Sequence, residues 1–308
     1  MSAAGAMWLA PLRGVTIRAF RETFAGAIRE AGFTGAVAPF IPANPGFRAS
    51  RRIFSDLEPF PKSAVEQFPL VPQVIGKDPA SLRDWCKAVK DLGFDRADLN
   101  AGCPFPMIVR RGRGSGLFRT PDVLERLLEV GCDEMGAGRF SLKTRLGLAH
   151  PDELRALMPM INRYPLAMLT VHARTAQQMY EGEVDRAAFG EILSLSKNPV
   201  VYNGDLSIDD HSIANHVSSD SRDASISSGG LVGVMVGRGF VRALGARDDA
   251  HELLRDYIAR SRAELCGDHP VLGRMKELLS YWSVWPEWRR LWPIVKICRS
   301  VDELLMLV

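Results

Sequence analysis

Short apolar runs recur along the chain, and each ends in a polar or glycine-bearing turn. The runs are spaced by roughly 25–40 residues, the repeat expected of a strand followed by a helix. Eight such units favour a (β/α)8 TIM barrel, whereas the competing doubly wound open sheet seldom needs eight. The predicted strands are Met7–Pro11, Gly35–Ala38, Leu70–Ile75, Arg96–Asn100, Phe140–Thr144, Met168–His172, Val200–Asn203 and Val232–Val236.

Amphipathic patterns between the runs predict helices. Apolar residues at helical spacing predict one helix over residues 16–31, with Thr16 as its N-cap. Proline at the first helical position marks two more beginnings. Asp78-Pro79 caps one of these helices, which runs to Leu92, and Thr120-Pro121 caps the other, which runs to Val130.

Three segments depart from the strand-helix repeat. Residues 40–69 are rich in proline and predict a long excursion after the second strand. Residues 218–230 are rich in serine and glycine and predict a flexible loop before the eighth strand. Beyond Gly239 the strand pattern stops. We therefore expect an α/β barrel domain over residues 1–241, followed by a small helical domain over residues 242–308.

Composition is that of a soluble enzyme, with 46% hydrophobic and 24% charged residues. The net charge of +3 neither indicates nor opposes a nucleic-acid partner. Five cysteines without a CxxC pair predict no metal site and suit a reducing cytoplasm. No secretory signal and no apolar run of about 18 residues is present, so we expect a cytoplasmic monomer away from membranes.

Polar residues gather where the predicted strands end, and in a barrel these ends share one face. Cys103 follows one strand, and Gly102 and Pro104 make the turn that stops it. A single buried cysteine is usually a small hydrophobe, but this one lies among polar strand ends. Lys143 follows apolar residues in its strand, so it needs an anionic partner. Gln73, Asn100, Arg145, His172 and Arg174 complete the group.

The last two strands end in glycine-bearing loops, Asn203-Gly204-Asp205 and Gly237-Arg238-Gly239. Barrels often bind a phosphate with these two loops. A cofactor phosphate there, with a ring extending toward Lys143 and Gln73, is a flavin mononucleotide (FMN) arrangement. The chain has no GxGxxG in a first βαβ unit, which argues against a Rossmann site.

Together these segments strongly resemble the tRNA-dihydrouridine synthases. The resemblance extends over residues 7–240 in order and spacing, and Arg274-Met275-Lys276 is similar to the family's C-terminal helical domain. The matching segments are Ala10-Pro11-Leu12-Arg13-Gly14-Val15-Thr16, Gln73-Val74-Ile75-Gly76, Leu99-Asn100-Ala101-Gly102-Cys103-Pro104, Lys143-Thr144-Arg145-Leu146-Gly147, Val171-His172-Ala173-Arg174-Thr175, Asn203-Gly204-Asp205 and Met235-Val236-Gly237-Arg238-Gly239.

The resemblance implies a barrel that uses FMN and NADPH, or NADH, to reduce the 5,6 double bond of a uridine in tRNA. Cys103 would donate the proton, and Asn100 would orient the uracil. The implied cofactor-binding residues are Pro11, Leu12, Arg13, Gln73, Lys143, His172, Asn203, Gly204, Asp205, Gly237 and Arg238. Leu12 replaces the family's usual methionine, and Val184-Asp185-Arg186 replaces Ala-Asp-Trp.

A uridine stacked in folded RNA must be extruded to reach a barrel mouth, and phosphate contacts must hold the rest of the RNA. We expect these contacts from arginines that follow Cys103 and from the helical domain, whose tryptophans we interpret as core. The candidates for substrate or tRNA contacts are Asn100, Arg145, Arg174, Arg110, Arg111, Arg113, Arg274 and Lys276. Two alternatives are a reductase of free pyrimidines that resembles dihydroorotate dehydrogenase, and a flavin-free RNA-binding barrel.

Overall fold

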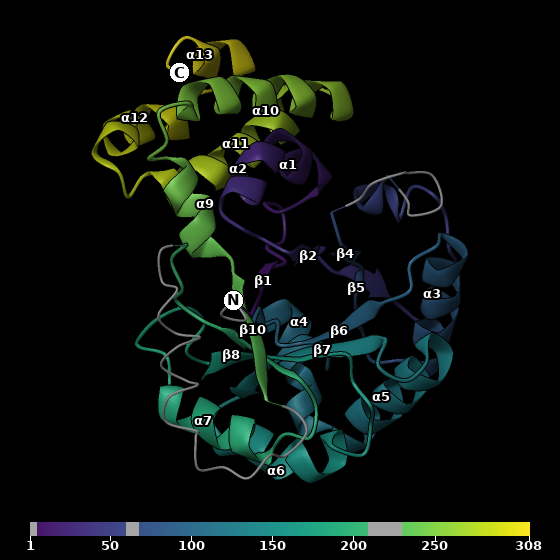
Figure 1. Cartoon of the computed structure of the whole chain (residues 1–308). Coiled ribbons are helices and arrows are strands. Elements are labelled where there is room, and N and C mark those ends of the chain that lie inside the picture. The colour runs from purple at the N-terminus through teal and green to yellow at the C-terminus, as the bar shows by residue number, and fades with distance from the viewer. Residues whose placement is uncertain (1–4, 60–67, 209–229) are drawn as a thin grey trace.

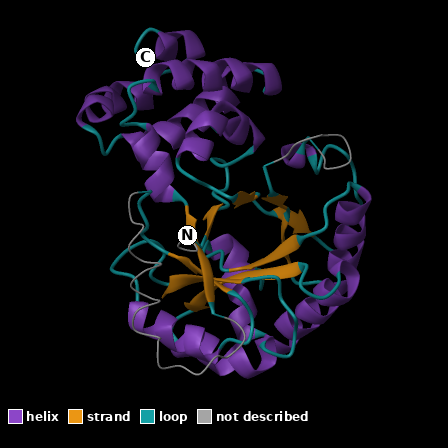
Figure 2. Cartoon of the chain, in the orientation of Figure 1, coloured by secondary structure: helices purple, strands orange, loops and turns teal. Residues whose placement is uncertain are grey.

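The computed structural model describes residues 5–59, 68–208 and 230–308 (Figure 1). Parallel strands form a barrel with helices around it, and a group of helices lies beyond one end (Figure 2). This confirms the predicted fold class. The strands are β1 (Ala6–Leu9), β2 (Gly35–Val37), β3 (Ile41–Ala43), β4 (Leu70–Val71), β5 (Gln73–Gly76), β6 (Ala97–Ala101), β7 (Phe140–Gly147), β8 (Leu169–Thr175), β9 (Val200–Asn203) and β10 (Leu231–Val236).

The barrel closes through one extended segment that Pro72 divides. The first half of this segment, β4, pairs with β2, and the second half, β5, pairs with β6. The segment Leu70–Gly76 thereby connects the two sides of the sheet and closes the barrel. Pro72 has no N–H for a ladder, but its carbonyl oxygen accepts from Asp98 N at 2.9 Å. β10 pairs with β1 on the other side. All eight predicted strands are confirmed, and β3, which pairs with β5, lies in the excursion where no strand was expected.

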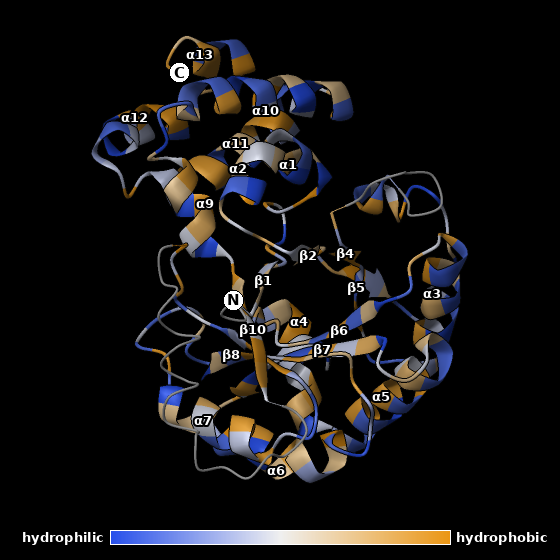
Figure 3. Cartoon of the chain, in the orientation of Figure 1, coloured by the Kyte–Doolittle hydropathy of each residue, from blue (hydrophilic) through white to orange (hydrophobic). Residues whose placement is uncertain are grey.

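Helices cover the outside of the barrel, and α3 and α5 mix hydrophobic and hydrophilic residues, as two-sided helices do (Figure 3). The helices are α1 (Arg18–Thr23), α2 (Ala25–Glu30), α3 (Pro79–Asp91), α4 (Pro106–Arg110), α5 (Pro121–Met135), α6 (Asp152–Ile161), α7 (Arg186–Leu195), α9 (Arg238–Leu244), α10 (Ala250–Glu264), α11 (Asp268–Trp282), α12 (Pro286–Ile297) and α13 (Val301–Leu305), with 3₁₀ turns η1 (Ser55–Leu57) and η3 (Gly114–Arg119).

Two cap predictions are wrong and one is confirmed. Asp78 caps α3 by accepting from Ser81 N. Thr120 makes no side-chain cap bond, although Pro121 begins α5 as expected. Thr16 caps no helix, because its hydroxyl accepts from Leu12 N at 2.8 Å and donates to Ala10 O at 2.9 Å. It therefore folds the loop after β1, and the helix predicted over residues 16–31 is divided into α1 and α2 at Phe24.

The C-terminal helices share a core with α1 and α2. The Phe24 ring lies 5.6 Å from Tyr257 and 6.4 Å from Trp282, measured between centroids. Trp282 and Trp288 are buried, and their indole N–H groups donate to Val241 O and Gly245 O. These two tryptophans are core, as interpreted, whereas the interpretation is wrong for Trp285, which is exposed and lines the cavity described below. The predicted domain boundary at residue 241 falls inside α9, and the loop predicted over residues 218–230 lies outside the described residues, apart from Gly230.

Candidate active site

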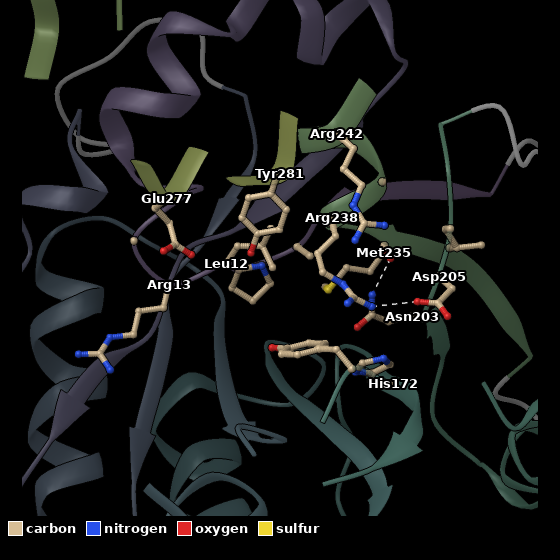
Figure 4. A pocket seen from close by; sticks show the side chains of 18 of the residues that line it. Leu12, Arg13, His172, Asn203, Asp205, Met235, Arg238, Arg242, Glu277 and Tyr281 are labelled. Carbon is tan, nitrogen blue, oxygen red and sulfur yellow. Dashed lines mark hydrogen bonds and ion pairs between the residues drawn. The ribbon is translucent and has the colours of Figure 1, made fainter. Parts of the chain in front are cut away.

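A cavity of about 1270 Å³ lies between the carboxyl ends of the strands and the C-terminal helices. Pockets for one small ligand are typically about 300–1,000 Å³, so this cavity has room for a cofactor and part of a second molecule. Figure 4 shows side chains from the strand ends facing Glu277 and Tyr281 of α11. Fourteen of the predicted site residues line it: Pro11, Leu12, Arg13, Asn100, Cys103, Lys143, Arg145, His172, Asn203, Gly204, Asp205, Gly237, Arg238 and Arg274.

Cys103 is held by main-chain contacts on two sides. Its N–H donates to Asn100 Oδ1 at 2.9 Å, and its carbonyl oxygen accepts from Ser115 N at 3.1 Å. Gly114 packs so closely that a Cβ there would lie 2.8 Å from the Cys103 Cβ. The Cys103 side chain is 7% exposed, and burial raises the pKa of its thiol, although the Phe105 N–H and nearby cations oppose that rise. The thiol therefore stays protonated at neutral pH.

Lys143 enters the cavity from β7. Its Nζ donates to Asn203 Oδ1 at 3.1 Å, and Asn203 Nδ2 donates to Met235 O at 2.7 Å. Burial and the Arg145 charge lower the pKa of Lys143 to about 8, against the attraction of Asp98. Among the described residues no carboxylate forms an ion pair with Nζ, and the expected anionic partner is thus absent from that part of the chain. An ammonium has three donors, so Nζ can also bind an anionic ligand.

Two glycines shape the end of the cavity near β9 and β10. Gly204 has a φ of +137°, and a Cβ there would lie 2.8 Å from Val184 Cγ1 and 3.2 Å from the His172 ring. Gly237 is the N-cap of α9, and Arg238 is its first residue. A Cβ at Gly237 would lie 3.0 Å from the Ala10 Cβ, so neither position accommodates a side chain without a shift of its neighbours. Asp205 accepts from Arg238 at 2.9 Å and also pairs with Arg174.

His172 lies at the same end and is 7% exposed. Burial and the charges of Arg145, Lys143, Arg174 and Arg238 hold its pKa well below the ordinary value. The ring is therefore neutral near pH 7, with one donor and one acceptor nitrogen. Its Nε2 lies 3.4 Å from Arg174 Nη1, which makes Nε2 the acceptor.

Arg145 and Arg174 mainly hold loops together. Arg145 donates to the carbonyl oxygens of Gly102, Thr175 and Met179, at 3.1, 2.8 and 2.6 Å. Arg174 donates to Glu181 O and Gly182 O in addition to its ion pair, and it does not line the cavity. Arg145 lines it with its guanidinium 5.2 Å from the Tyr180 ring. The structure thus gives both arginines a framework role, and their contact with RNA stays a prediction.

Gln73 lies behind the cavity wall. It is fully buried, donates from Nε2 to Asp98 Oδ2 at 2.7 Å, and accepts from Asn100 Nδ2 at 2.9 Å. Asn100 in turn accepts from the N–H groups of Gly102 and Cys103. Burial raises the pKa of Asp98 to about 7. The amide of Asn100, expected to orient uracil, is thus engaged in holding the Cys103 loop.

The predicted RNA-contacting side chains differ in availability. Arg110 and Arg111, at the end of α4, are exposed, whereas Arg113 is partly buried. In the helical domain, Arg274 donates to Glu264 at 2.9 Å and Ser261 Oγ at 3.1 Å. Lys276 donates to two carbonyl oxygens at the end of α12, Lys296 O and Cys298 O. The arginines after Cys103 are therefore the more accessible set.

The cavity residues that sequence reasoning missed include Arg242, Glu277 and Tyr281. Arg242 follows Arg238 by four residues on α9, a spacing that places both on one helix face and could have indicated it. Glu277 and Tyr281 have the same spacing on α11, but only tertiary packing brings that helix over the barrel. Across residues 5–59, 68–208 and 230–308, no group of acidic, histidine and cysteine side chains could hold a metal ion. In the same ranges no helix is long and apolar enough to span a membrane.

Comparison with known proteins gives the family. The sequence model of the family described as dihydrouridine synthase matches residues 8–278. A probable tRNA-dihydrouridine synthase of Rhodobacter capsulatus is 30% identical over 237 residues, which are 75% of this chain and 66% of the relative. The probable tRNA-dihydrouridine synthase 2 of Bacillus subtilis is 29% identical over 191 residues, 61% of this chain and 55% of the relative. The chain thus spans between half and two thirds of the length of these relatives.

Solved structures support the fold. An old yellow enzyme homologue from Zymomonas mobilis has a TM-score of 0.53 at 13% identity and covers 78% of this chain and 86% of its own. Morphinone reductase has a TM-score of 0.51 at 11% identity, with coverages of 78% and 85%. At these identities the likeness concerns the fold alone. Since the family match extends over most of the barrel and into α11, the chain belongs to the dihydrouridine synthase family.

Proposed function

We propose that this protein is a tRNA-dihydrouridine synthase, which reduces the C5=C6 bond of a uridine in tRNA with FMN and NADPH, or NADH. The observation that carries the proposal is that one cavity of a family member contains both a protonated thiol and a cationic lysine. Cys103 and Lys143 both line that cavity. A protonated cysteine can serve as a general acid, and a buried ammonium stabilises developing negative charge.

The donors of the cavity fit FMN. Arg238 and the glycine loops at Gly204 and Gly237 form an anion-binding end, suited to the phosphate group. Lys143 has donors available for an electronegative ring edge, and the neutral imidazole of His172 offers a donor without adding charge. We therefore assign the phosphate to the first set and the ring to the second. When bound and reduced, FMN supplies the hydride that adds to C6 of uracil.

The protein's own residues complete the reduction. The Cys103 thiol donates its proton to C5, because its raised pKa keeps that proton in place at neutral pH. Asn100 and Ser115 fix the main chain of Cys103, so the thiol is positioned before the substrate arrives. The overall balance is one hydride and one proton added to the uracil, with NADPH oxidised to NADP⁺. The cysteine is afterwards reprotonated from solvent.

The tRNA must present an extruded base to this cavity. Arg110 and Arg111 are exposed at the end of α4, the helix that follows Cys103, and we assign them contacts with phosphates of the tRNA. The helical domain forms the opposite wall through α11. We therefore propose that the tRNA lies across the mouth between α4 and the helical domain.

The test is to map dihydrouridine in RNA from cells with and without the gene, and then to restore the wild-type gene or Cys103→Ala. We expect dihydrouridine to disappear from one or a few tRNA positions and to return only with the wild-type gene. Unchanged dihydrouridine after deletion, in a strain without a second synthase, would falsify the proposal. Turnover of free uracil compounds by the purified protein, with none on tRNA, would instead select a free-pyrimidine reductase.

A further inference from the structure

Asp98 is a fully buried acid that the proposed reaction does not use. It lies in β6 two residues before Asn100, so both side chains point to the same face of the sheet. Gln73 of β5 is its register partner on one side, and Ser141 of β7 on the other. Burying a carboxyl group costs free energy unless its oxygens are hydrogen-bonded, and Asp98 Oδ1 has no partner among the described residues. The burial of Asp98 in the strand that leads to Cys103 therefore needs an explanation.

The hydrogen bonds around Asp98 form a chain with a fixed direction. Main-chain N–H groups can only donate, so Asn100 must turn Oδ1 toward Gly102 and Cys103. Its Nδ2 then donates to Gln73 Oε1, which leaves Gln73 Nε2 as the donor toward Asp98. The chain can end only on an acceptor. Asp98 Oδ2, 2.7 Å from Gln73 Nε2, is that acceptor.

The geometry points to Asp98 as a positioning residue for Cys103, acting through Gln73 and Asn100 to hold the cysteine main chain at the cavity wall. An apolar residue at position 98 would leave Gln73 Nε2 without an acceptor. If the Gln73 amide then rotated, its Nε2 would compete with the Cys103 N–H for Asn100 Oδ1. No described residue donates to the other oxygen, Asp98 Oδ1. Hence the one hydrogen bond that explains the carboxyl group is the bond that Oδ2 accepts from Gln73 Nε2.

This role requires an acceptor at the Oδ2 position and no negative charge. Asparagine is isosteric with aspartate and can present its own Oδ1 to Gln73, so Asp98→Asn should preserve the chain. Asp98→Leu has a similar size and removes the acceptor. Gln73→Met breaks the chain one step nearer to Cys103 without altering Asp98. Ser141→Ala is the matched control, because Ser141 is the register partner of Asp98 and its hydroxyl has no partner among the described residues.

The first readout needs no tRNA activity. The rate of iodoacetamide alkylation is measured by peptide mass spectrometry at Cys103, with exposed Cys266 as internal reference. We expect Asp98→Leu and Gln73→Met to raise the Cys103 rate about five- to tenfold, the factor that one lost buried hydrogen bond contributes to local opening. Asp98→Asn and Ser141→Ala should stay within about twofold of wild type, a limit well below that factor.

The second readout rests on the proposed function. For the variants that break the chain, we expect kcat for uridine reduction in tRNA to fall on the order of a hundredfold, as for a reacting group misplaced by about 1 Å. In Asp98→Leu the rate of flavin reduction by NADPH should be unchanged, and Asp98→Asn should retain the wild-type kcat for tRNA.

The inference is overturned if Asp98→Asn raises Cys103 alkylation as much as Asp98→Leu, or if Ser141→Ala does so. It is also overturned if Asp98→Leu and Gln73→Met leave the alkylation rate unchanged. Where Asp98→Leu does not fold, Gln73→Met against Asp98→Asn decides the same question. A wild-type protein inactive on tRNA would refute the proposed function, whereas the alkylation rates would still decide the role of Asp98.

Discussion

Gly114→Ala tests how the loop after α4 holds Cys103, the proposed proton donor. Gly114 has a φ of +54°, and an added Cβ would lie 2.8 Å from both the Cβ and the carbonyl oxygen of Cys103. Real Cβ atoms essentially never approach backbone so closely, so Cys103 or η3 must shift. Gly112 in the same segment is the matched control, with a φ of +70° and only Lys77 side-chain atoms nearby, at 3.6 Å and beyond.

The magnitude follows from two contributions. A left-handed backbone costs an L-residue about 1–2 kcal/mol, and this cost applies to both variants. Overpacking adds about 1–3 kcal/mol, and only Gly114→Ala incurs it. The smaller unfolded chain entropy of alanine stabilises both variants equally, by about 0.4–1 kcal/mol. We therefore expect Gly114→Ala to lower the free energy of unfolding by about 1–3 kcal/mol more than Gly112→Ala.

The assay is urea unfolding of both variants beside wild type, together with kcat on tRNA. If the loop in Gly114→Ala relieves the close contact by moving, the free energy of unfolding falls less, and kcat falls on the order of a hundredfold because Cys103 is displaced. Gly112→Ala should keep kcat near wild type. Equal unfolding free energies and equal kcat values for the two variants would refute the close packing of Gly114 on Cys103.

Three further predictions concern the cavity. Because the pKa of Lys143 is about 8, its ammonium form is present below that pH and is lost above it. We therefore expect kcat to decline as pH rises through 8, and a pH–rate profile of Lys143→Met should lack this decline. In Arg145→Lys one ammonium cannot reach the three carbonyl oxygens that Arg145 binds, so calorimetry should show the free energy of unfolding lowered by about 2–4 kcal/mol. For Arg110→Lys at an exposed position the decrease should be less than about 0.5 kcal/mol. Equal decreases would count against the framework role of Arg145. Gly204→Ala places a Cβ against Val184 and His172, so flavin titration should show affinity reduced by about tenfold or more. Gly182→Ala, where a Cβ would have only Gln178 Nε2 at 3.8 Å nearby, should bind flavin normally. Unchanged affinity in Gly204→Ala would exclude this loop from the proposed flavin site.

Much of the barrel and of its cavity could be predicted from the sequence, because a parallel strand buried on both faces is a short apolar run and its end is marked by polar residues. Asn203 ends β9 as this pattern predicts, whereas β7 and β8 extend three or four residues beyond Lys143 and His172; all three residues line the cavity. Thr16 shows where local rules fail. A threonine before a helix suggests an N-cap, but the loop after β1 uses its hydroxyl instead.

The remaining features depend on contacts between segments far apart in the chain. Glu277 and Tyr281 reach the cavity because α11 packs on α1 and α2 through aromatic residues, and no spacing within α11 signals that contact. Gln73 was expected at a strand end, but it is the first residue of β5 and its side chain donates to Asp98 in the neighbouring strand. Strand register decides this, and register depends on the whole sheet.

The central claim is that Cys103 supplies the proton in an FMN-dependent reduction of tRNA. The most direct measurement is dihydrouridine formed per mole of enzyme when purified protein, FMN and NADPH are mixed with unmodified tRNA, for wild type and Cys103→Ala with equal bound flavin. We predict multiple turnovers for wild type, and a rate at least a hundredfold lower for Cys103→Ala, at the lower end of the usual contribution of a general acid, about 10²–10⁴-fold. Dihydrouridine formed by Cys103→Ala at the wild-type rate would contradict the claim.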